Sequence, residues 1–337
     1  MTPALLAVSP LAVSLGDPAG VGPELIAEAW AQREQEGLPP FFVCGGRGVL
    51  EQVARQMGKA VPIIAIEEIA DARAAFSQGL PVLGATGPAW RPGQPDSDGA
   101  SLAYDSLKWA TSMVRSGLAS GLVTGPIAKS LLAAIGFDYP GQTEFVAEAC
   151  GIAAEDAVMM LAGPSLRTVP LTVHVALAEV PGLITSMLIE RRATIVAAAL
   201  KRDFGLASPR LAIAALNPHA GEQGRMGDED TEIIAPAVAA LRAAGIDASG
   251  PHSADALFSP HKRGSYDVAI CMYHDQALIP VKALDFDQGV NVTLGLPIVR
   301  TSPDHGTAFD IAGTGQASAG AMIAAIRMAG ECAGRRV

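Results

Sequence analysis

Three of the six histidines follow apolar runs that have the length of β-strands. His174 lies in "PLTVHVAL", His219 lies in "LNPHAGE" after "LAIAAL", and His274 lies in "YHDQ" after "VAICM". In open α/β sheets, ligands bind beyond the carboxyl ends of the strands. Histidines in this position on separate strands can therefore converge. Three neutral imidazoles with open coordination positions are typical of a catalytic rather than a structural metal site.

Two carboxylates stand close to these histidines in the sequence. Asp275 follows His274 directly, and Glu222 lies shortly after His219. Each could be a metal ligand or could fix the orientation of a histidine ring. For each histidine alone, a buried ring with a satisfied hydrogen bond is the alternative. The string "HExxH" does not occur, which excludes that type of zinc hydrolase.

A second group of polar residues lies between apolar strands and glycines near the end of the chain. Its members are Lys282, Asn291, Arg300, Asp304, His305 and Thr307. Charged residues usually lie on a solvated surface, but this setting favours a clamp for a carboxylate or a phosphate. Arginine offers a planar fork with two donors and lysine offers a point charge, which together suit a substrate with two anionic ends.

Two glycine-rich stretches could approach a ligand through their backbone. "GDPAGVGPE" (16–24) leads from a strand into a helix, so its N–H groups and the helix N-terminus could hold an anion. "CGGRG" (44–48) is consistent with a simple tight turn. Neither is a G-x-G-x-x-G fingerprint and no Walker A string occurs, which argues against a standard Rossmann site and a P-loop kinase.

The elements that position these residues alternate between strands and helices, which predicts a mostly parallel sheet of α/β class. Strands are expected at 11–15, 41–45, 121–125, 168–177, 210–216 and 266–273. Helices are expected at 23–37, 97–117, 184–205, 228–245 and 318–334.

The length, net charge, cysteine pattern and apolar stretches of the chain restrict the class of protein further. A length of 337 residues favours two domains. A net charge of −10 argues against a nucleic-acid partner. The four cysteines are scattered without a C-x-x-C pair, as in a reducing compartment. Because no stretch of 18 apolar residues could span a membrane, we expect a cytoplasmic protein.

Five strings in order carry a family resemblance. "SLGDPAGVGPEL", "LNPHAGE", "MYHDQ", "GVNVTLGLP" and "RTSPDHGTAFDIAG" together resemble the 4-hydroxythreonine-4-phosphate dehydrogenase family of vitamin B6 biosynthesis. Both ends also resemble the wider isocitrate/isopropylmalate dehydrogenase type. The resemblance implies two α/β/α lobes with a cleft between them. It predicts a nucleotide-binding lobe of residues 1–130 plus 285–337, and a lobe for metal, substrate and dimerisation of residues 131–284.

The resemblance also implies roles for individual residues. A divalent metal would be held by His174, His219 and His274. The substrate would be contacted by Gln142, Thr143, Lys282, Asn291 and Arg300. The loop 304–313 would bind the adenosine part of the nucleotide through Asp304, His305, Gly306, Thr307 and Asp310. Candidate catalytic groups are Lys282, Asp275 and Asp255, the two aspartates being contributed by a partner chain.

The activity implied by the resemblance is a metal-dependent, NAD- or NADP-linked oxidation of 4-phosphooxy-L-threonine. Its β-keto acid product would lose CO₂ to give 3-amino-2-oxopropyl phosphate. The expected cofactors are NAD or NADP and one zinc, cobalt or magnesium ion for each site. The family also implies a homodimer with shared active sites, in which His274 reaches the partner's site.

Two departures from the family pattern keep the substrate open. Gln142 stands where the family usually has histidine, and Ala128 in "VTGPIAK" replaces an amide side chain. One alternative is a related dehydrogenase that acts on D-erythronate or D-threonate 4-phosphate or on a cyclic cis-dihydrodiol. The others are an acyl- or phosphate-transferring enzyme and a non-catalytic small-molecule binder, but neither explains the adenosine-type loop.

Overall fold

A computed structural model describes residues 9–58 and 61–336, which form two compact units. The first unit contains the chain through Ala154 and again from Leu296, and the second unit contains Glu155–Gly295. The first unit is therefore discontinuous in sequence. The boundaries expected from the sequence, after residues 130 and 284, lie earlier in the chain than these divisions.

The first unit contains a parallel sheet with the strand order β3-β4-β2-β1-β5-β12. Its strands are β1 (Leu11–Ser14), β2 (Phe41–Cys44), β3 (Ile63–Ile66), β4 (Leu80–Leu83), β5 (Leu122–Thr124) and β12 (Arg300–Pro303). The returning end of the chain places β12 beside β5. Most of these strands are buried along their whole length, as expected of parallel strands covered on both faces.

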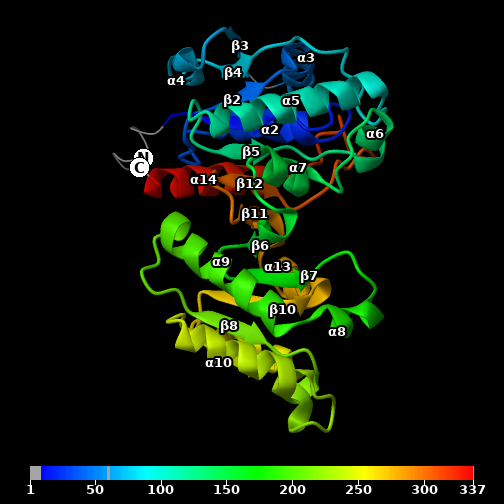
Figure 1. Ribbon diagram of the computed structural model, residues 1–337. Coiled ribbons are helices and arrows are strands. Elements are labelled where there is room, and N and C mark those ends of the chain that lie inside the picture. The colour runs from blue at the N-terminus through cyan, green and yellow to red at the C-terminus, as the bar shows by residue number, and fades with distance from the viewer. Residues whose placement is uncertain (1–8, 59–60, 337) are drawn as a thin grey trace. The chain divides into compact units, whose positions relative to one another are not determined.

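Helices cover the first sheet (Figure 1). They are α2 (Gly22–Ala31), α3 (Arg47–Met57), α4 (Ala72–Phe76) after a short η1 (Ile69–Asp71), α5 (Ser97–Arg115), α6 (Lys129–Ala134), α7 (Gln142–Ala149) and α14 (Gly320–Arg335). Helix α5 packs on β1 and β2, and α14 packs on β12 and β5. The start of α5 is fixed by Asp96, whose carboxylate accepts the N–H of Gly99 at 2.8 Å.

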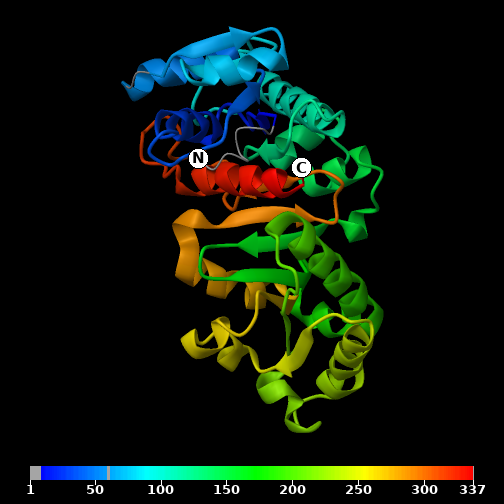
Figure 2. The same cartoon turned by 90° about the vertical axis from the view of Figure 1, so that its left-hand side faces the viewer.

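The second unit contains a mixed sheet with the order β11-β6-β7-β10-β8-β9. Its strands are β6 (Val158–Ala162), β7 (Arg167–Thr172), β8 (Leu211–Ala214), β9 (Ala248–His252), β10 (Val268–Tyr273) and β11 (Val290–Leu294). The pairs β11/β6 and β6/β7 are antiparallel and can be followed in Figure 2. The neighbours β7, β10, β8 and β9 are parallel, so their carboxyl ends share one edge of the sheet.

The remaining elements of the second unit include three longer helices and several short turns. They are η2 (Ala154–Asp156, at the start of the unit), η3 (Leu177–Glu179), α8 (Val180–Leu183), α9 (Ser186–Phe204), η4 (Pro218–Glu222), the π-helical η5 (Asp230–Ile234), α10 (Ala235–Ala243), α11 (Ala254–Leu257), α12 (Pro260–Arg263), α13 (His274–Asp285) and η6 (Phe286–Gln288). Helix α13 packs on β7 and β10. In the described part of the chain, no helix has the length and apolar character needed to cross a membrane. The predicted α/β class is confirmed.

Candidate active site

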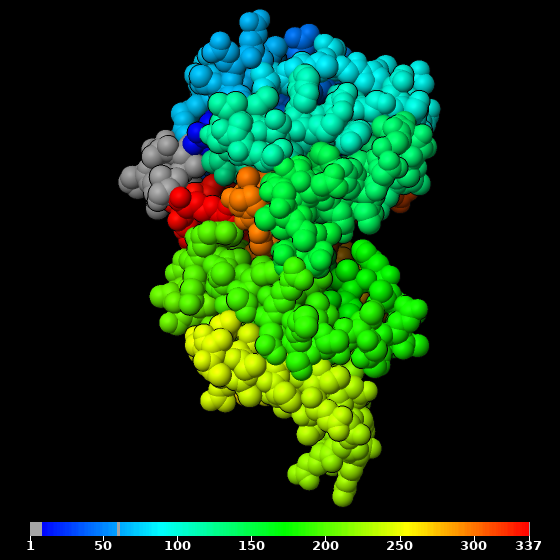
Figure 3. Space-filling model, viewed as in Figure 1, coloured from blue at the N-terminus to red at the C-terminus, as the bar shows by residue number. Residues whose placement is uncertain are grey.

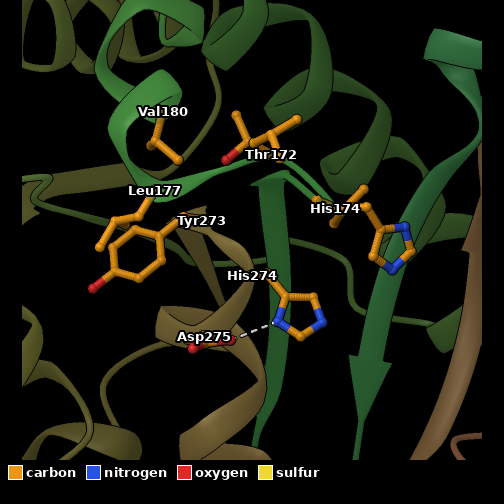
Figure 4. Close-up of a pocket in the computed structure, with 9 residues that line it drawn as sticks. Thr172, His174, Leu177, Val180, Tyr273, His274 and Asp275 are labelled. Atoms are coloured by element: carbon orange, nitrogen blue, oxygen red, sulfur yellow. Dashed lines mark hydrogen bonds and ion pairs between the residues drawn. The ribbon is translucent and has the colours of Figure 1, made fainter.

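His174 and His274 follow the adjacent parallel strands β7 and β10. Their ring centroids lie 5.9 Å apart, and Figure 4 shows both rings at the same pocket. Two imidazoles that share a zinc ion, each with its nitrogen about 2 Å from the metal, have centroids about 5–6 Å apart. The spacing of this pair therefore fits a shared ion. The pocket has a volume of about 310 Å³ and is lined by Thr172, Val173, His174, Val175, Leu177, Val180, Tyr273, His274 and Asp275.

The ring of His274 is oriented by its neighbour in the sequence. Nδ1 of His274 lies 2.7 Å from Oδ1 of Asp275, as the dashed line in Figure 4 shows. A carboxylate on one ring nitrogen sets the tautomer and directs the other nitrogen to a ligand. Asp275 can therefore orient His274, which is one of the two roles that the sequence left open for it.

His219 lies in a turn after β8 whose backbone is left-handed at several residues that are not glycine. The φ angles of His219 and Ala220 are both 53°, and those of Glu222 and Gln223 are 42° and 59°. Such conformations cost about 1 kcal/mol or more each, and they are concentrated at functional sites. Residues 222–226 are exposed and project from the second unit (Figure 3).

Asp230 fixes the chain that leads into the His219 turn. Its carboxylate is only 1% exposed and accepts the backbone N–H groups of Leu216 at 2.8 Å and Asn217 at 3.1 Å. It also accepts the side-chain amide of Asn217 at 3.0 Å. Sequence reasoning did not select Asp230, because its partners lie 13 and 14 residues away and no local pattern connects them.

Asp255 follows β9, the strand next to β8, and lies near His219. The hydroxyl of Ser253 donates to the Asp255 carboxylate and is the main reason that its pKa is lowered. The backbone N–H of Ala256 lowers this pKa further, and His219 adds a smaller effect. The four neighbouring strands thus carry His174, His274, His219 and Asp255 at or just beyond their carboxyl ends. Among the described residues, however, no three His, Cys, Asp or Glu side chains of the one chain are grouped closely enough to hold a metal.

Lys282 and Asn291 also belong to the second unit. Lys282 lies on α13, two turns after His274, and Asn291 lies on β11 opposite Leu161 of β6. The side-chain oxygen of Asn291 is buried, and no described residue donates a hydrogen bond to it. Buried acceptors are usually paired, so this oxygen suits a donor from a ligand.

Arg300, Gln142 and Thr143 are brought together in the first unit. Arg300 begins β12 and is 4% exposed. Its Nη2 donates to Gln142 Oε1 at 3.0 Å and to Thr124 Oγ1 at 2.8 Å, and its Nη1 lies 3.4 Å from Thr143 Oγ1. Burial lowers the pKa of Arg300 to about 10, so the guanidinium is still charged at neutral pH. Thr124 was not selected from the sequence, although it lies in the quoted string "VTGPIAK".

The glycine-rich turn 16–24 holds the loop 304–313, which carries Asp304, His305, Gly306, Thr307 and Asp310. The backbone N–H of Val21 donates to the carbonyl of Thr307 at 2.9 Å, and the N–H of Gly313 donates to the Glu24 carboxylate. A Cβ atom on Gly20 would lie 2.7 Å from the Thr307 carbonyl oxygen. Gly20 is therefore needed for close contact between two backbone segments.

Asp17 in the same turn gives a pH-dependent prediction. Burial raises its pKa, and Asp96 raises it further, against the lowering effect of the hydrogen bond from the Ala19 N–H. A raised native pKa means that stability is greatest below the unfolded value, about 4, and is lost as the pH rises through the native pKa. Asp17→Asn is therefore expected to unfold at higher urea concentration than the wild type at pH 8, with a smaller gain at pH 4. Exposed Asp105→Asn is the control, and an equal gain at both pH values would contradict the prediction.

Comparisons with known proteins agree with the family expected from the five strings. The family model of the pyridoxal phosphate biosynthetic protein PdxA matches residues 38–329. A 4-hydroxythreonine-4-phosphate dehydrogenase of Erythrobacter litoralis is 63% identical over 327 residues, which are 97% of both chains. The crystal structure of the Klebsiella pneumoniae enzyme of that name is 35% identical, with a TM-score of 0.85 over 96% of this chain and 99% of that one.

A structure with a different name is more distant. The terephthalate 1,2-cis-dihydrodiol dehydrogenase of Burkholderia xenovorans is 30% identical, with a TM-score of 0.65 over 96% of this chain and 98% of that one. The matched family and its high-identity relative thus confirm the assignment made from the sequence. The chain belongs to the PdxA family of pyridoxal phosphate biosynthetic proteins.

Proposed function

We propose that this protein is a metal-dependent, NAD- or NADP-linked 4-hydroxythreonine-4-phosphate dehydrogenase of the cytoplasm. It oxidises 4-phosphooxy-L-threonine to a β-keto acid, which loses CO₂ to give 3-amino-2-oxopropyl phosphate. The observation that carries the proposal is the 63% identity, over 97% of the chain, to a relative of that name. The positions of the proposed site residues give it physical support.

The residues proposed to hold the divalent metal are His174, His219 and His274. The three histidines follow the neighbouring parallel strands β7, β8 and β10, and the rings of His174 and His274 lie 5.9 Å apart. Imidazole ligands favour zinc or cobalt over magnesium, which prefers oxygen. When bound, the ion supplies Lewis-acid chemistry that makes a coordinated hydroxyl more acidic. The proposed homodimer completes each site with ligands from both chains.

Substrate recognition is assigned to Arg300, Lys282 and Asn291, with Gln142 and Thr143 beside Arg300. Arg300, held by Thr124, Thr143 and Gln142, presents a charged group for an anionic end of the substrate. In the second unit, the side-chain nitrogen of Lys282 offers a further polar contact, and the unsatisfied oxygen of Asn291 offers an acceptor for the substrate's ammonium group. An α-amino acid phosphate has both chemistries, whereas a carbocyclic dihydrodiol lacks the ammonium group.

Lys282, as the neutral amine, is the proposed general base among the three candidates. Asp275 is hydrogen-bonded to His274, and the pKa of Asp255 is lowered by Ser253, which makes that carboxylate a weaker base. The nicotinamide accepts a hydride, and its adenosine part is assigned to the loop with Asp304, His305, Gly306, Thr307 and Asp310. The hydrogen bonds to Thr307 and Gly313 hold this loop in place.

The test is the appearance of reduced nicotinamide with 4-phosphooxy-L-threonine, zinc and either NAD⁺ or NADP⁺. We expect rapid reduction that chelation abolishes and zinc restores. D-Erythronate 4-phosphate and a cyclic cis-dihydrodiol are tested in parallel, because the more distant dihydrodiol dehydrogenase makes the second a specific alternative. Turnover of either compound without turnover of the threonine derivative would overturn the proposed substrate.

A further inference from the structure

Gln142 lies in a position where both ends of its side-chain amide are used. It is the first residue of α7 and is 8% exposed. Its Nε2 donates to the backbone carbonyl of Gly125 at 2.9 Å, and its Oε1 accepts from Nη2 of Arg300 at 3.0 Å. The amide therefore connects the chain after β5 to the guanidinium at the start of β12.

The chemistry of these two partners allows only one orientation of the amide. A guanidinium can only donate hydrogen bonds, and a carbonyl oxygen can only accept them. The oxygen of Gln142 must therefore face Arg300, and its nitrogen must face Gly125.

The Gly125 end of this link is fixed in the first unit. The backbone N–H of Gly125 donates to the carbonyl of Ser14 at 3.0 Å, and a Cβ atom on Gly125 would lie 2.6 Å from the carbonyl oxygen of Leu15. The segment that follows β5 is thus packed directly against Ser14, at the end of β1, and Leu15, which follows it. A side chain anchored to Gly125 holds Arg300 in one place.

From this arrangement we infer that Gln142 is a positioning residue. It does not contact the substrate's anionic group itself, but holds Arg300 in the position that binds this group. It does so at any pH between 5 and 8. The inference rests on the proposed function, in which Arg300 contacts that group. Among the other side chains, a neutral histidine could also accept from Arg300 and donate to Gly125. A protonated histidine could not accept, and it would place a second positive charge against the guanidinium.

The other charged groups around Gln142 do not replace this link. Glu144 on α7 is the carboxylate that acts on Arg300, and Lys129 of α6 lies near Gly141. Histidine is the side chain that ordinarily titrates between pH 5 and 8. The first unit has only one, His305, which is exposed in the loop 304–313. His305 is the same in every variant, so its effect cancels in a comparison between variants.

The test measures binding of 4-phosphooxy-L-threonine by calorimetry from pH 5.5 to pH 8.5. The readout is the ratio of the variant's Kd to the wild-type Kd, because titration of the ligand's phosphate cancels in it. For Gln142→His we expect this ratio to rise about tenfold or more as the pH falls from 8 to 5.5, which corresponds to one pKa-linked step. For Gln142→Leu, which can form neither hydrogen bond, we expect weaker binding at every pH.

The control and the contrary outcomes are distinct. Gln78→His adds a histidine at an exposed position of the same unit, and its Kd ratio should stay constant with pH. A constant ratio for Gln142→His, or wild-type binding by Gln142→Leu, would overturn the inference. If the wild type itself does not bind the ligand at any pH, the proposed substrate fails and, with it, the basis of the inference.

Discussion

Replacing His219 by alanine is expected to lower kcat by about a thousandfold or more and to weaken metal binding. Loss of an outer partner of a metal ligand already costs about 10- to 100-fold, so loss of a ligand costs more. The hydrogen bonds from Leu216 and Asn217 to Asp230 hold the chain that leads into the His219 turn, and neither of them uses the imidazole. The variant should therefore fold normally. Turnover and zinc content after dialysis are the two measurements.

His261→Ala is the matched control for this variant. His261 lies in α12 of the same unit, is exposed, and is outside the proposed ligand set. Its kcat and zinc content should equal those of the wild type. A kcat within threefold of the wild type for His219→Ala, after metal removal and addition of zinc, would refute the ligand role.

Mixing of inactive variants tests whether the metal ligands come from two chains. The family resemblance implies that His274 reaches the partner's site, so we expect His219 and His274 of one site to belong to different chains. Refolding His219→Ala with His274→Ala should then give hybrid dimers with one intact site each. With random pairing, about half of the dimers are hybrids, and each hybrid has one of its two sites intact. About a quarter of the wild-type activity should therefore be restored. Absence of any restoration in confirmed hybrids would place both residues of a site on one chain.

The histidine positions could be predicted because their signal is local. Each histidine follows an apolar run, and parallel neighbours place the ends of β7, β10 and β8 at the same edge. Strand order was not readable, because pairing between β7 and β10 joins residues about a hundred positions apart. Which histidines approach one another in one chain depends on that order.

Helix α13 was not predicted, although it carries His274, Asp275 and Lys282. It begins at the residue after β10 without a turn, and Pro280 lies inside it. Proline removes a backbone donor and normally interrupts a helix, so the local sequence does not favour a continuous helix. Packing of α13 on β7 and β10 outweighs this cost. Tertiary contacts of this kind leave no local pattern.

The turn "GDPAGVGPE" contacts residues that lie far away in the sequence. Its glycines predict an anion site at a helix N-terminus, and the structure adds that Gly20 lies against Thr307 and that Glu24 accepts from Gly313. These partners lie nearly 300 residues further along the chain. The sequence contained both strings, and only the structure connects them.

A second large effect is expected at the hydrogen bond between Glu24 and Gly313 of the loop 304–313. Glu24 lies in the first turn of α2, is 7% exposed, and accepts the N–H of Gly313, while Gln56 Nε2 donates to the Gly313 carbonyl at 2.7 Å. Glu24→Ala removes the acceptor and leaves a backbone donor without this partner, which costs about 1–3 kcal/mol. Because binding of the nucleotide must then also order the loop 304–313, we expect the Kd for the nucleotide to rise by about tenfold or more.

Glu24→Gln separates the hydrogen bond from the charge. Burial raises the pKa of Glu24, so the site disfavours the charged form, and the amide oxygen of glutamine can still accept from Gly313. We therefore expect Glu24→Gln to bind the nucleotide more tightly than Glu24→Ala. Glu28→Ala, one turn further along α2, removes a carboxylate that accepts from Gln32 at the end of the same helix and should not change the Kd. Hydrogen exchange of residues 304–315 gives an independent readout, since Glu24→Ala should raise exchange there. If Glu24→Ala binds the nucleotide as tightly as the wild type, with unchanged exchange, Glu24 does not hold the loop.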